Sequence, residues 1–117
     1  MVESATSLSN FREELIEAGN LTLNPANYRV TVAGRAVELT YREFDFLRFL
    51  ASRPDRVIDF RELTQALWQS QGHKEVRRLN VLAVRLRAKL AGSAPYRIET
   101  VRGRGYGLVK SQSAEGA

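Results

Sequence analysis

A predicted helix over residues 75–91 carries the side chains best suited to binding another molecule. Spacings of three and four residues place its apolar side chains in one stripe, which we expect to face the core. This stripe consists of Val76, Leu79, Ala83, Leu86 and Leu90. At about 100° per residue, a different sector of the helix holds Arg78, Val81, Leu82, Arg85 and Lys89. The pattern therefore predicts a helix with one apolar face and one cationic face.

A cationic helix face of this kind suits the major groove of DNA. The groove is wide enough to admit an α-helix, Arg can form two hydrogen bonds with guanine, and small apolar side chains can contact the thymine methyl group. The residues expected to contact bases are Arg85, Val81, Arg78 and Leu82. Basic residues at the flanks bind phosphates and set the register of a protein on the duplex. The residues expected to contact phosphates are Arg77, Arg87, Lys89 and Thr40.

A second basic segment, residues 96–110, predicts two strands around an Arg-Gly-Arg-Gly turn. Glycine permits positive φ and close backbone approach, which places Arg102 and Arg104 at the tip of a hairpin. An arginine there can enter a minor groove, where narrow A·T tracts concentrate negative potential. A hairpin turn with solvated arginines is the simpler alternative. A dinucleotide-binding loop is disfavoured, because no helix follows the glycines and their spacing is wrong.

The basic charge is concentrated in the C-terminal third of the 117-residue chain. Residues 74–110 hold ten Lys and Arg against two Glu, whereas residues 1–73 hold eight basic and ten acidic residues. This asymmetry indicates a polyanionic partner, nucleic acid before membrane. The chain has no cysteine, no apolar run long enough for a membrane span and no signal-peptide pattern. We therefore expect a cytoplasmic protein that does not bind membranes.

Enzymatic chemistry is disfavoured by the residue types present. One histidine, no cysteine and no clustered carboxylates leave no catalytic set. His73 is expected in a loop rather than at a metal, because a metal site needs several ligands. We expect no cofactor and no metal. The remaining alternative to DNA binding is a protein-interaction module whose basic helix binds an acidic partner, with Val81 and Leu82 as its exposed apolar pair.

The rest of the chain predicts the elements that position this helix and hairpin. Residues 20–39 alternate with a period of two and contain turn signals at 24–27 and 33–34, so they predict a small antiparallel sheet. Thr40 and Glu43 form a capping box for a helix that ends near Ser52. Residues 1–19 predict a linker or a short helix, residues 20–110 one domain, and residues 111–117 a disordered tail.

A second predicted helix begins at Asp59, which is placed to cap it. Its buried stripe is expected to be Leu63, Ala66 and Leu67. Residues 69–73 then form a polar loop before the basic helix. The order of elements is therefore a sheet, three helices and a terminal hairpin.

Four segments in this order resemble one family. Residues 39–47 (LTYREFDFL) resemble the LTxxEFxLL segment of the OmpR/PhoB-type effector domain of two-component response regulators, and residues 61–68 resemble its second helix. Residues 77–90 (RRLNVLAVRLRAKL) resemble its RTVDVHIxRLRxKL recognition helix, and residues 101–108 (VRGRGYGL) its VRGxGYxL wing. The resemblance implies an α+β winged helix-turn-helix with an N-terminal antiparallel sheet, three helices and a C-terminal β-hairpin wing.

The resemblance also implies roles and partners. It implies base contacts at Val81 and Arg85, phosphate contacts at Arg77 and Arg87, and a minor-groove contact at Arg102. It implies a loop that faces RNA polymerase, formed by Gln69, Ser70, Gln71, Gly72 and His73. Members bind direct repeats of double-stranded DNA as tandem homodimers, downstream of a receiver domain. The chain is either an effector domain of a longer regulator or a stand-alone regulator.

Some residues depart from the family pattern within these motifs. Asn80 and Leu82 stand where the family often has Asp and His, and Ala83 stands where it has Ile. Because Leu82 removes a polar DNA contact, the target sequence cannot be taken from relatives. Arg78 stands where the family commonly has Thr, and Arg104 stands where it commonly has a small polar residue. The added positive charge favours stronger binding to the DNA backbone.

Overall fold

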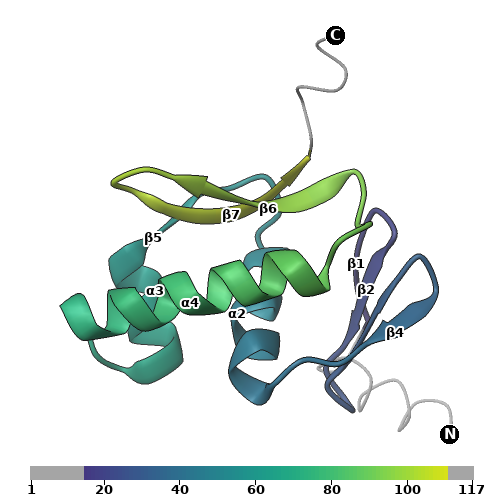
Figure 1. Ribbon diagram of the computed structural model, residues 1–117, viewed down its shortest axis with the longest axis horizontal. Helices are drawn as coiled ribbons and strands as arrows, with labels where there is room; N and C mark the ends of the chain where they lie inside the picture. The colour runs from purple at the N-terminus through teal and green to yellow at the C-terminus, as the bar shows by residue number, and fades with distance from the viewer. Residues whose placement is uncertain (1–14, 111–117) are drawn as a thin grey trace, which may run out of the picture.

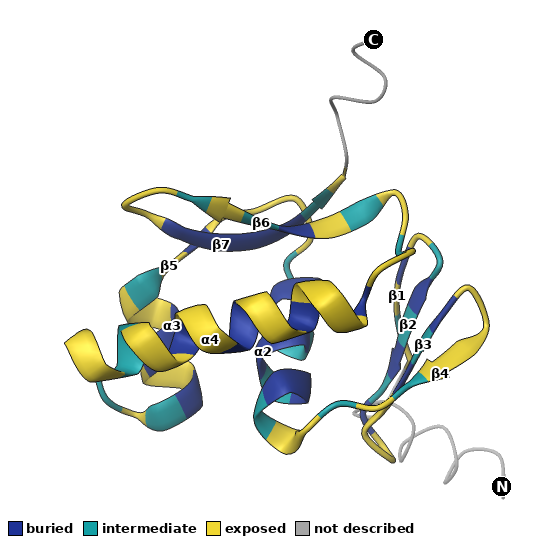
Figure 2. Cartoon of the chain, in the orientation of Figure 1, coloured by how far each residue is buried: buried dark blue, intermediate teal, exposed yellow. Residues whose placement is uncertain are grey.

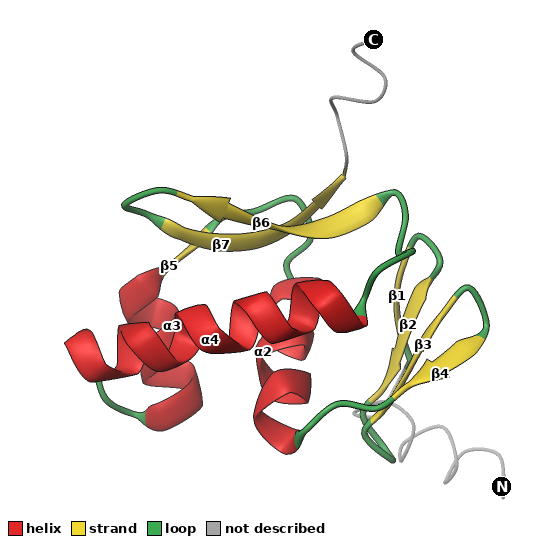
Figure 3. Cartoon of the chain, viewed as in Figure 1, coloured by secondary structure: helices red, strands yellow, loops and turns green. Residues whose placement is uncertain are grey.

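The computed structural model describes residues 15–110, and the predictions for residues 1–14 and 111–117 lie outside the described residues. An N-terminal sheet stands at one end of a group of three helices, and a three-stranded sheet covers another side of that group (Figure 1). Figure 3 shows the helices in red, with the three-stranded sheet above them and the N-terminal sheet to their right. The core lies where these elements meet, and its largest fully buried side chains include Phe44, Phe46 and Leu79.

The N-terminal sheet has four antiparallel strands in sequence order. They are β1 (Ile16–Ala18), β2 (Leu21–Asn24), β3 (Arg29–Val32) and β4 (Arg35–Val37). The alternation predicted this arrangement correctly from β2 onward, because Leu21, Leu23, Val30 and Val32 all point into the core.

The first strand corrects the expectation of a linker or a short helix over residues 1–19. Ile16–Ala18 pairs with β2, and Ala18 is buried opposite Leu21. Gly19 turns the chain between these strands at φ +62°, and a Cβ there would lie 2.4 Å from the carbonyl oxygen of Ala94. The strand thus depends on partners in β2 and on contact with the loop after the basic helix, neither of which local helix signals can reveal.

Helix α2 spans Tyr41–Ala51 and begins with the predicted capping box. The Glu43 amide donates to the Thr40 hydroxyl at 3.2 Å, and the Thr40 amide donates to Oε1 of Glu43 at 2.9 Å. The helix ends at Ala51 with Ser52 as its C-cap, which agrees with the predicted end near Ser52. Two amide donors of the first turn are therefore satisfied within the box.

Helix α3 spans Phe60–Trp68 and is capped by Asp59, as predicted. Its buried residues are Leu63, Thr64 and Leu67, so the expectation that Ala66 is buried was wrong. Thr64 can be buried because its hydroxyl donates to the carbonyl of Phe60 at 2.9 Å. A satisfied hydroxyl behaves as part of the core, whereas the hydrophobicity pattern scored it as polar.

Helix α4, the basic helix, spans His73–Lys89 and packs against α2, α3 and strand β6 (Tyr96–Val101). It begins two residues before the predicted start, so His73 belongs to the helix rather than to the loop. Gly72, in extended conformation, is its N-cap. The helix ends at Lys89 with Leu90 as its C-cap, two residues before the predicted end at Ala91.

The C-terminal hairpin has the predicted form, with β6 and β7 (Gly105–Lys110) around residues 102–104. Strand β5 (Ile58–Asp59) pairs with the other edge of β7 and makes a three-stranded sheet. A Cβ at Gly105 would lie 1.9 Å from the carbonyl oxygen of Ile58, and one at Gly107 would lie 2.4 Å from that of Arg56. These two glycines therefore allow the chain before α3 to cross closely over the hairpin.

Candidate nucleic-acid interface

The side of α4 that faces away from the core carries exposed arginines. Arg77, Arg78 and Arg85 are all exposed, and Val81 lies among them with 48 % of its surface accessible. Figure 2 shows exposed residues recurring along the length of α4. The predicted cationic face thus exists, and arginine side chains on it can reach a ligand without moving the core.

Leu82 does not belong to this face, which corrects its assignment as a base-contacting residue. Its side chain is only 7 % exposed. Leu82 lies three residues after Leu79 and four before Leu86, and both of these are fully buried. Positions with these spacings share one helix face, so Leu82 extends the core toward α3. The sequence offered two apolar sectors, and packing against α2 and α3 decided which one is buried.

Lys89, which the sequence predicted to contact phosphate, also makes an ion pair within the protein. Its Nζ lies 2.7 Å from Oε1 of Glu43, a carboxylate whose side chain is 1 % exposed. The Lys89 side chain is 37 % exposed. This ion pair joins the last turn of α4 to the first turn of α2, so we assign Lys89 a structural role.

The pKa of Glu43 reflects its surroundings. Burial raises the pKa, but hydrogen bonds from Lys89 and the Thr40 amide, together with the Lys89 charge, outweigh it and leave the pKa below its ordinary value. The other carboxylate oxygen, Oε2, has no hydrogen-bond partner among the described residues. Glu43 is therefore an ionised group that relies on Lys89.

Two guanidinium groups, one of them from the cationic face of α4, lie over the ring of Trp68. The Arg42 and Arg78 carbons Cζ lie 5.6 Å and 5.9 Å from the ring centroid. Arg42 also donates to the carbonyl of Leu67. These residues, with Val81, Leu82 and Arg85, line a hollow of about 300 Å³. The Arg78 guanidinium therefore lies near the Trp68 ring, a contact that amphipathic spacing alone could not assign.

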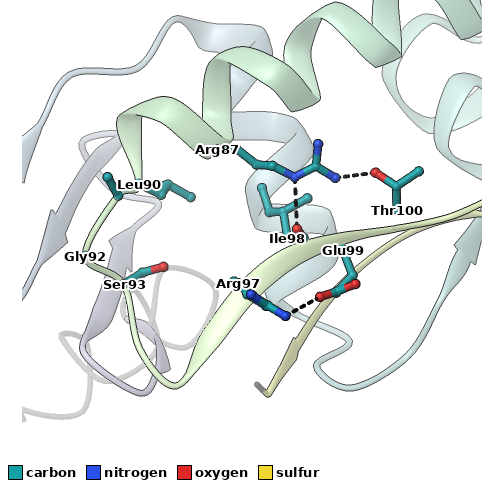
Figure 4. A pocket seen from close by; sticks show the side chains of 9 residues that line it. Arg87, Leu90, Gly92, Ser93, Arg97, Ile98, Glu99 and Thr100 are labelled. Carbon is teal, nitrogen blue, oxygen red and sulfur yellow. Dashed lines mark hydrogen bonds and ion pairs between the residues drawn. The ribbon is translucent and has the colours of Figure 1, made fainter. Parts of the chain in front are cut away.

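Arg87 links α4 to the hairpin. Its Nε donates to the carbonyl of Ile98 at 3.1 Å, and its terminal nitrogen donates to the hydroxyl of Thr100 (Figure 4). Arg97 and Glu99 form a separate ion pair of 2.9 Å on the same strand. Arg87 remains exposed. It therefore holds the hairpin against the helix while its charge stays on the surface.

A second link joins the two predicted binding elements. The Tyr106 hydroxyl of β7 donates to Oδ1 of Asn80 on α4. Tyr106 is 3 % exposed, and burial raises the pKa of its hydroxyl, so the group is neutral and can donate at neutral pH. Strand β7 of the hairpin is thereby attached to α4.

The tip itself presents the predicted arginines. Arg102 and Arg104 are both exposed. Gly103 between them has φ +73°, and the Arg104 amide donates to the carbonyl of Val101 at 2.9 Å to close the turn. A residue with positive φ is best supplied by glycine, so the Arg-Gly-Arg order follows from the turn.

The segment between α3 and α4 differs slightly from the predicted polar loop. Gln69 ends α3 in the left-handed conformation at φ 56°. The Ser70 hydroxyl donates to the Glu75 carboxylate at 3.0 Å, and the Gln71 amide donates to the side chain of Gln65 at 3.2 Å. Gln69, Gln71 and Gly72 are exposed. The segment is a short ordered connection anchored to both helices.

Two further observations concern the described residues only. Within residues 15–110, no group of three or more His, Asp or Glu side chains is placed to hold a metal ion. None of the helices in that range has the length and apolar character needed to cross a membrane.

Three helices between an antiparallel sheet and a hairpin, with α4 exposed beside the hairpin, define a winged-helix domain, and the hairpin is its wing. Residues 34–108 match the family described as "Transcriptional regulatory protein, C terminal". The chain belongs to this family, the OmpR/PhoB-type effector domains. The resemblance stated from the four motifs is therefore confirmed.

Known proteins similar to the chain include response regulators. The response regulator protein PmrA of Pseudomonas aeruginosa is 40 % identical over 90 residues, which cover 77 % of this chain and 39 % of that protein. The phosphate regulon transcriptional regulatory protein PhoB of Escherichia coli is 35 % identical over 95 residues, covering 80 % and 42 %. The chain thus spans about two-fifths of the length of these relatives.

Solved structures show the same fold. The Klebsiella pneumoniae RstA DNA-binding domain, crystallised in complex with the RstA box, matches with a TM-score of 0.74 and 36 % identity, over 82 % of this chain and 97 % of that one. The DNA-binding domain of CpxR from E. coli matches with a TM-score of 0.74 and 28 % identity, over 83 % and 97 %.

The site contains residues that the sequence analysis did not single out. Val84, which is 64 % exposed, lies three residues after Val81 on the same face of α4. Its helical spacing from Val81 was a signal that could have identified it. Trp68 and Arg42 act through contacts between different elements, for which the sequence carries no local signal.

Proposed function

We propose that this domain binds double-stranded DNA sequence-specifically and thereby regulates transcription. The observation that carries the proposal is the joint presentation of two basic elements. α4 exposes Arg77, Arg78 and Arg85, the wing exposes Arg102 and Arg104, and the Arg87 and Tyr106 bonds hold wing and helix together. A rigid pair of this kind can occupy adjacent grooves of one duplex.

The proposed roles follow from the position of each side chain. Arg85 contacts a guanine in the major groove, with Val81 and Arg78 beside it on α4. Arg102 enters the minor groove, and Arg104 lies next to it at the tip of the wing. The residues proposed to contact phosphates are Arg77, Arg87, Lys89 and Thr40, all of them exposed.

Known relatives support the same proposal. The similar RstA domain was crystallised with the RstA box, and the similar PmrA and PhoB are named as regulators. As a member of this family, the chain is proposed to act in the cytoplasm on direct repeats, as a tandem homodimer, within a regulator that carries a receiver domain. Residues 69–73 are proposed to contact RNA polymerase, supported by the exposure of Gln69, Gln71 and Gly72 between two anchored helices.

Selection from random duplex DNA tests the proposal directly. We expect enrichment of a defined motif, and Arg85→Ala should weaken binding to the selected site by about 1–3 kcal/mol and relax the preference at one base pair. Arg29→Ala is a matched control, because it removes an equal charge from an exposed position on the N-terminal sheet. Failure to enrich any motif would contradict the proposal and favour the acidic protein partner.

A further inference from the structure

The most exposed large apolar side chains on α4 are two valines. Val84 is 64 % exposed and Val81 is 48 % exposed, and the two are neighbours on one face because they are three residues apart. Both lie away from the buried residues of the helix, which are Leu79, Leu82, Ala83 and Leu86. We call Val81 and Val84 the valine pair.

Folding alone gives no reason for the valine pair. A β-branched residue has a lower helix propensity than Ala or a straight-chain residue, so an exposed helix position gains no stability from it. Neither side chain is buried by another part of residues 15–110. Adjacent exposed apolar groups on a helix instead indicate contact with a partner.

The charges around the valine pair restrict the partner. Arg77 precedes the pair, Arg85 directly follows Val84 on the side of the Trp68 hollow, and Arg87 lies on the side of the wing. An occupant must therefore be an anion that also presents small apolar groups to the helix. A DNA major groove meets both conditions, because thymine carries a 5-methyl group at the groove edge between two phosphate backbones.

We propose that Val84 is a specificity-determining residue that, with Val81, contacts thymine methyl groups in the operator. This inference rests on the proposed DNA binding and deepens it by naming the base feature that α4 recognises. The valines are separated by about 4.5 Å along the helix axis, since the rise is about 1.5 Å per residue. That separation is close to the roughly 3.4 Å base step of DNA, so the valine pair selects thymines at neighbouring base pairs.

Deoxyuridine substitution tests this inference in the selected duplex. Replacing one thymine by deoxyuridine removes only the 5-methyl group and leaves the hydrogen-bonding pattern intact. We expect one such replacement to weaken binding of the wild-type domain about fourfold, the change that corresponds to burial of one methyl group. Val84→Ala should weaken binding to the thymine site by a similar factor. Deoxyuridine at the thymine contacted by Val84 should then weaken DNA binding by the variant no further.

The controls separate this inference from the proposed function. Leu15→Ala removes another exposed apolar side chain, 52 % accessible and next to the N-terminal sheet, and should keep the full response to deoxyuridine. The inference is wrong if wild type binds its selected site equally well with deoxyuridine at every thymine, or if Val84→Ala keeps the whole response, although DNA binding would then stand. If no site can be selected, both the inference and the proposed function fail.

Discussion

Glu43 combines two structural tasks in one side chain. Its Oε1 accepts from the Thr40 amide at the start of α2 and also from Lys89 at the end of α4. A buried carboxylate is costly unless charged or hydrogen-bonding partners compensate for its lost hydration. The pair thus links the start of α2 to the end of α4.

Replacing Lys89 should reveal this dependence. We expect Lys89→Met to lower the free energy of unfolding at pH 7 by about 3 kcal/mol, the low end for breaking a buried pair, because the ammonium group is partly exposed. Urea denaturation measures the change. Lys74→Met, at an exposed position in the first turn of α4, should change it by less than about 0.5 kcal/mol. Equal effects of the two variants would contradict the assignment.

The loss of folding stability in Lys89→Met should depend on pH in a defined direction. The folded-state pKa of Glu43 is lowered, so its ionised form adds stability above the ordinary pKa of about 4.3, and that stability is lost as the pH falls through the lowered value. In Lys89→Met, the burial of Glu43 is no longer offset by Lys89, so we expect the pKa of the Glu43 carboxyl to be raised instead. The stability difference between wild type and variant should therefore be largest at neutral pH and should shrink as the pH falls from the raised pKa of the variant to the lowered pKa of the wild type.

The wing depends on close contact between β5 and β7 as well as on its own turn. The Tyr106–Asn80 and Arg87–Thr100 bonds attach it to α4, while β5 pairs with its other edge. The position of Arg102 relative to α4 is consequently set by three elements. A wing on a flexible tether would lose more conformational entropy when it binds.

We expect Gly105→Ala to destabilise the domain by about 3 kcal/mol, the upper part of the range for overpacking. Its Cβ would lie 1.9 Å from the Ile58 carbonyl oxygen, a backbone atom that cannot rotate away. Thermal unfolding followed by circular dichroism measures the effect. Gly72→Ala is the control, because its Cβ approaches only the flexible end of Glu75, at 3.0 Å. A wild-type melting temperature for Gly105→Ala would show that β5 does not need this contact.

The whole molecule separates its charges by region. Most of the positive charge lies in residues 74–110, which form α4 and the wing, whereas the N-terminal sheet and the first two helices are close to neutral or acidic. A polyanion is therefore attracted toward one side of the domain before any specific contact forms.

The salt dependence of DNA binding should report this arrangement. Each neutralised phosphate contributes about −0.9 to the slope of log K against log salt concentration. We expect Arg77→Ala to make the slope shallower by about one and to weaken selected and random DNA alike, whereas Arg29→Ala should leave the slope unchanged. Fluorescence anisotropy at several salt concentrations measures both. An unchanged slope for Arg77→Ala would remove Arg77 from the set of phosphate contacts.

The amino-acid sequence by itself determined the local features of this protein. The capping signals at Thr40 and Asp59, the alternation of Leu21 and Leu23, and the Arg-Gly-Arg turn each depend on residues within a few positions of one another. Such interactions form within one turn or one hairpin, so sequence spacing suffices to predict them. The arginine face of α4 was predicted for the same reason.

Only the tertiary structure decided which side chains and strands pair with another part of the protein. Leu82 is buried in the core, Lys89 forms an ion pair with Glu43, and β1 is a strand because it pairs with β2. Each outcome depends on a partner from another element, up to 46 residues away in the case of Lys89. Side-chain type states what a residue can bind, but packing determines whether its partner is another part of the protein or a ligand.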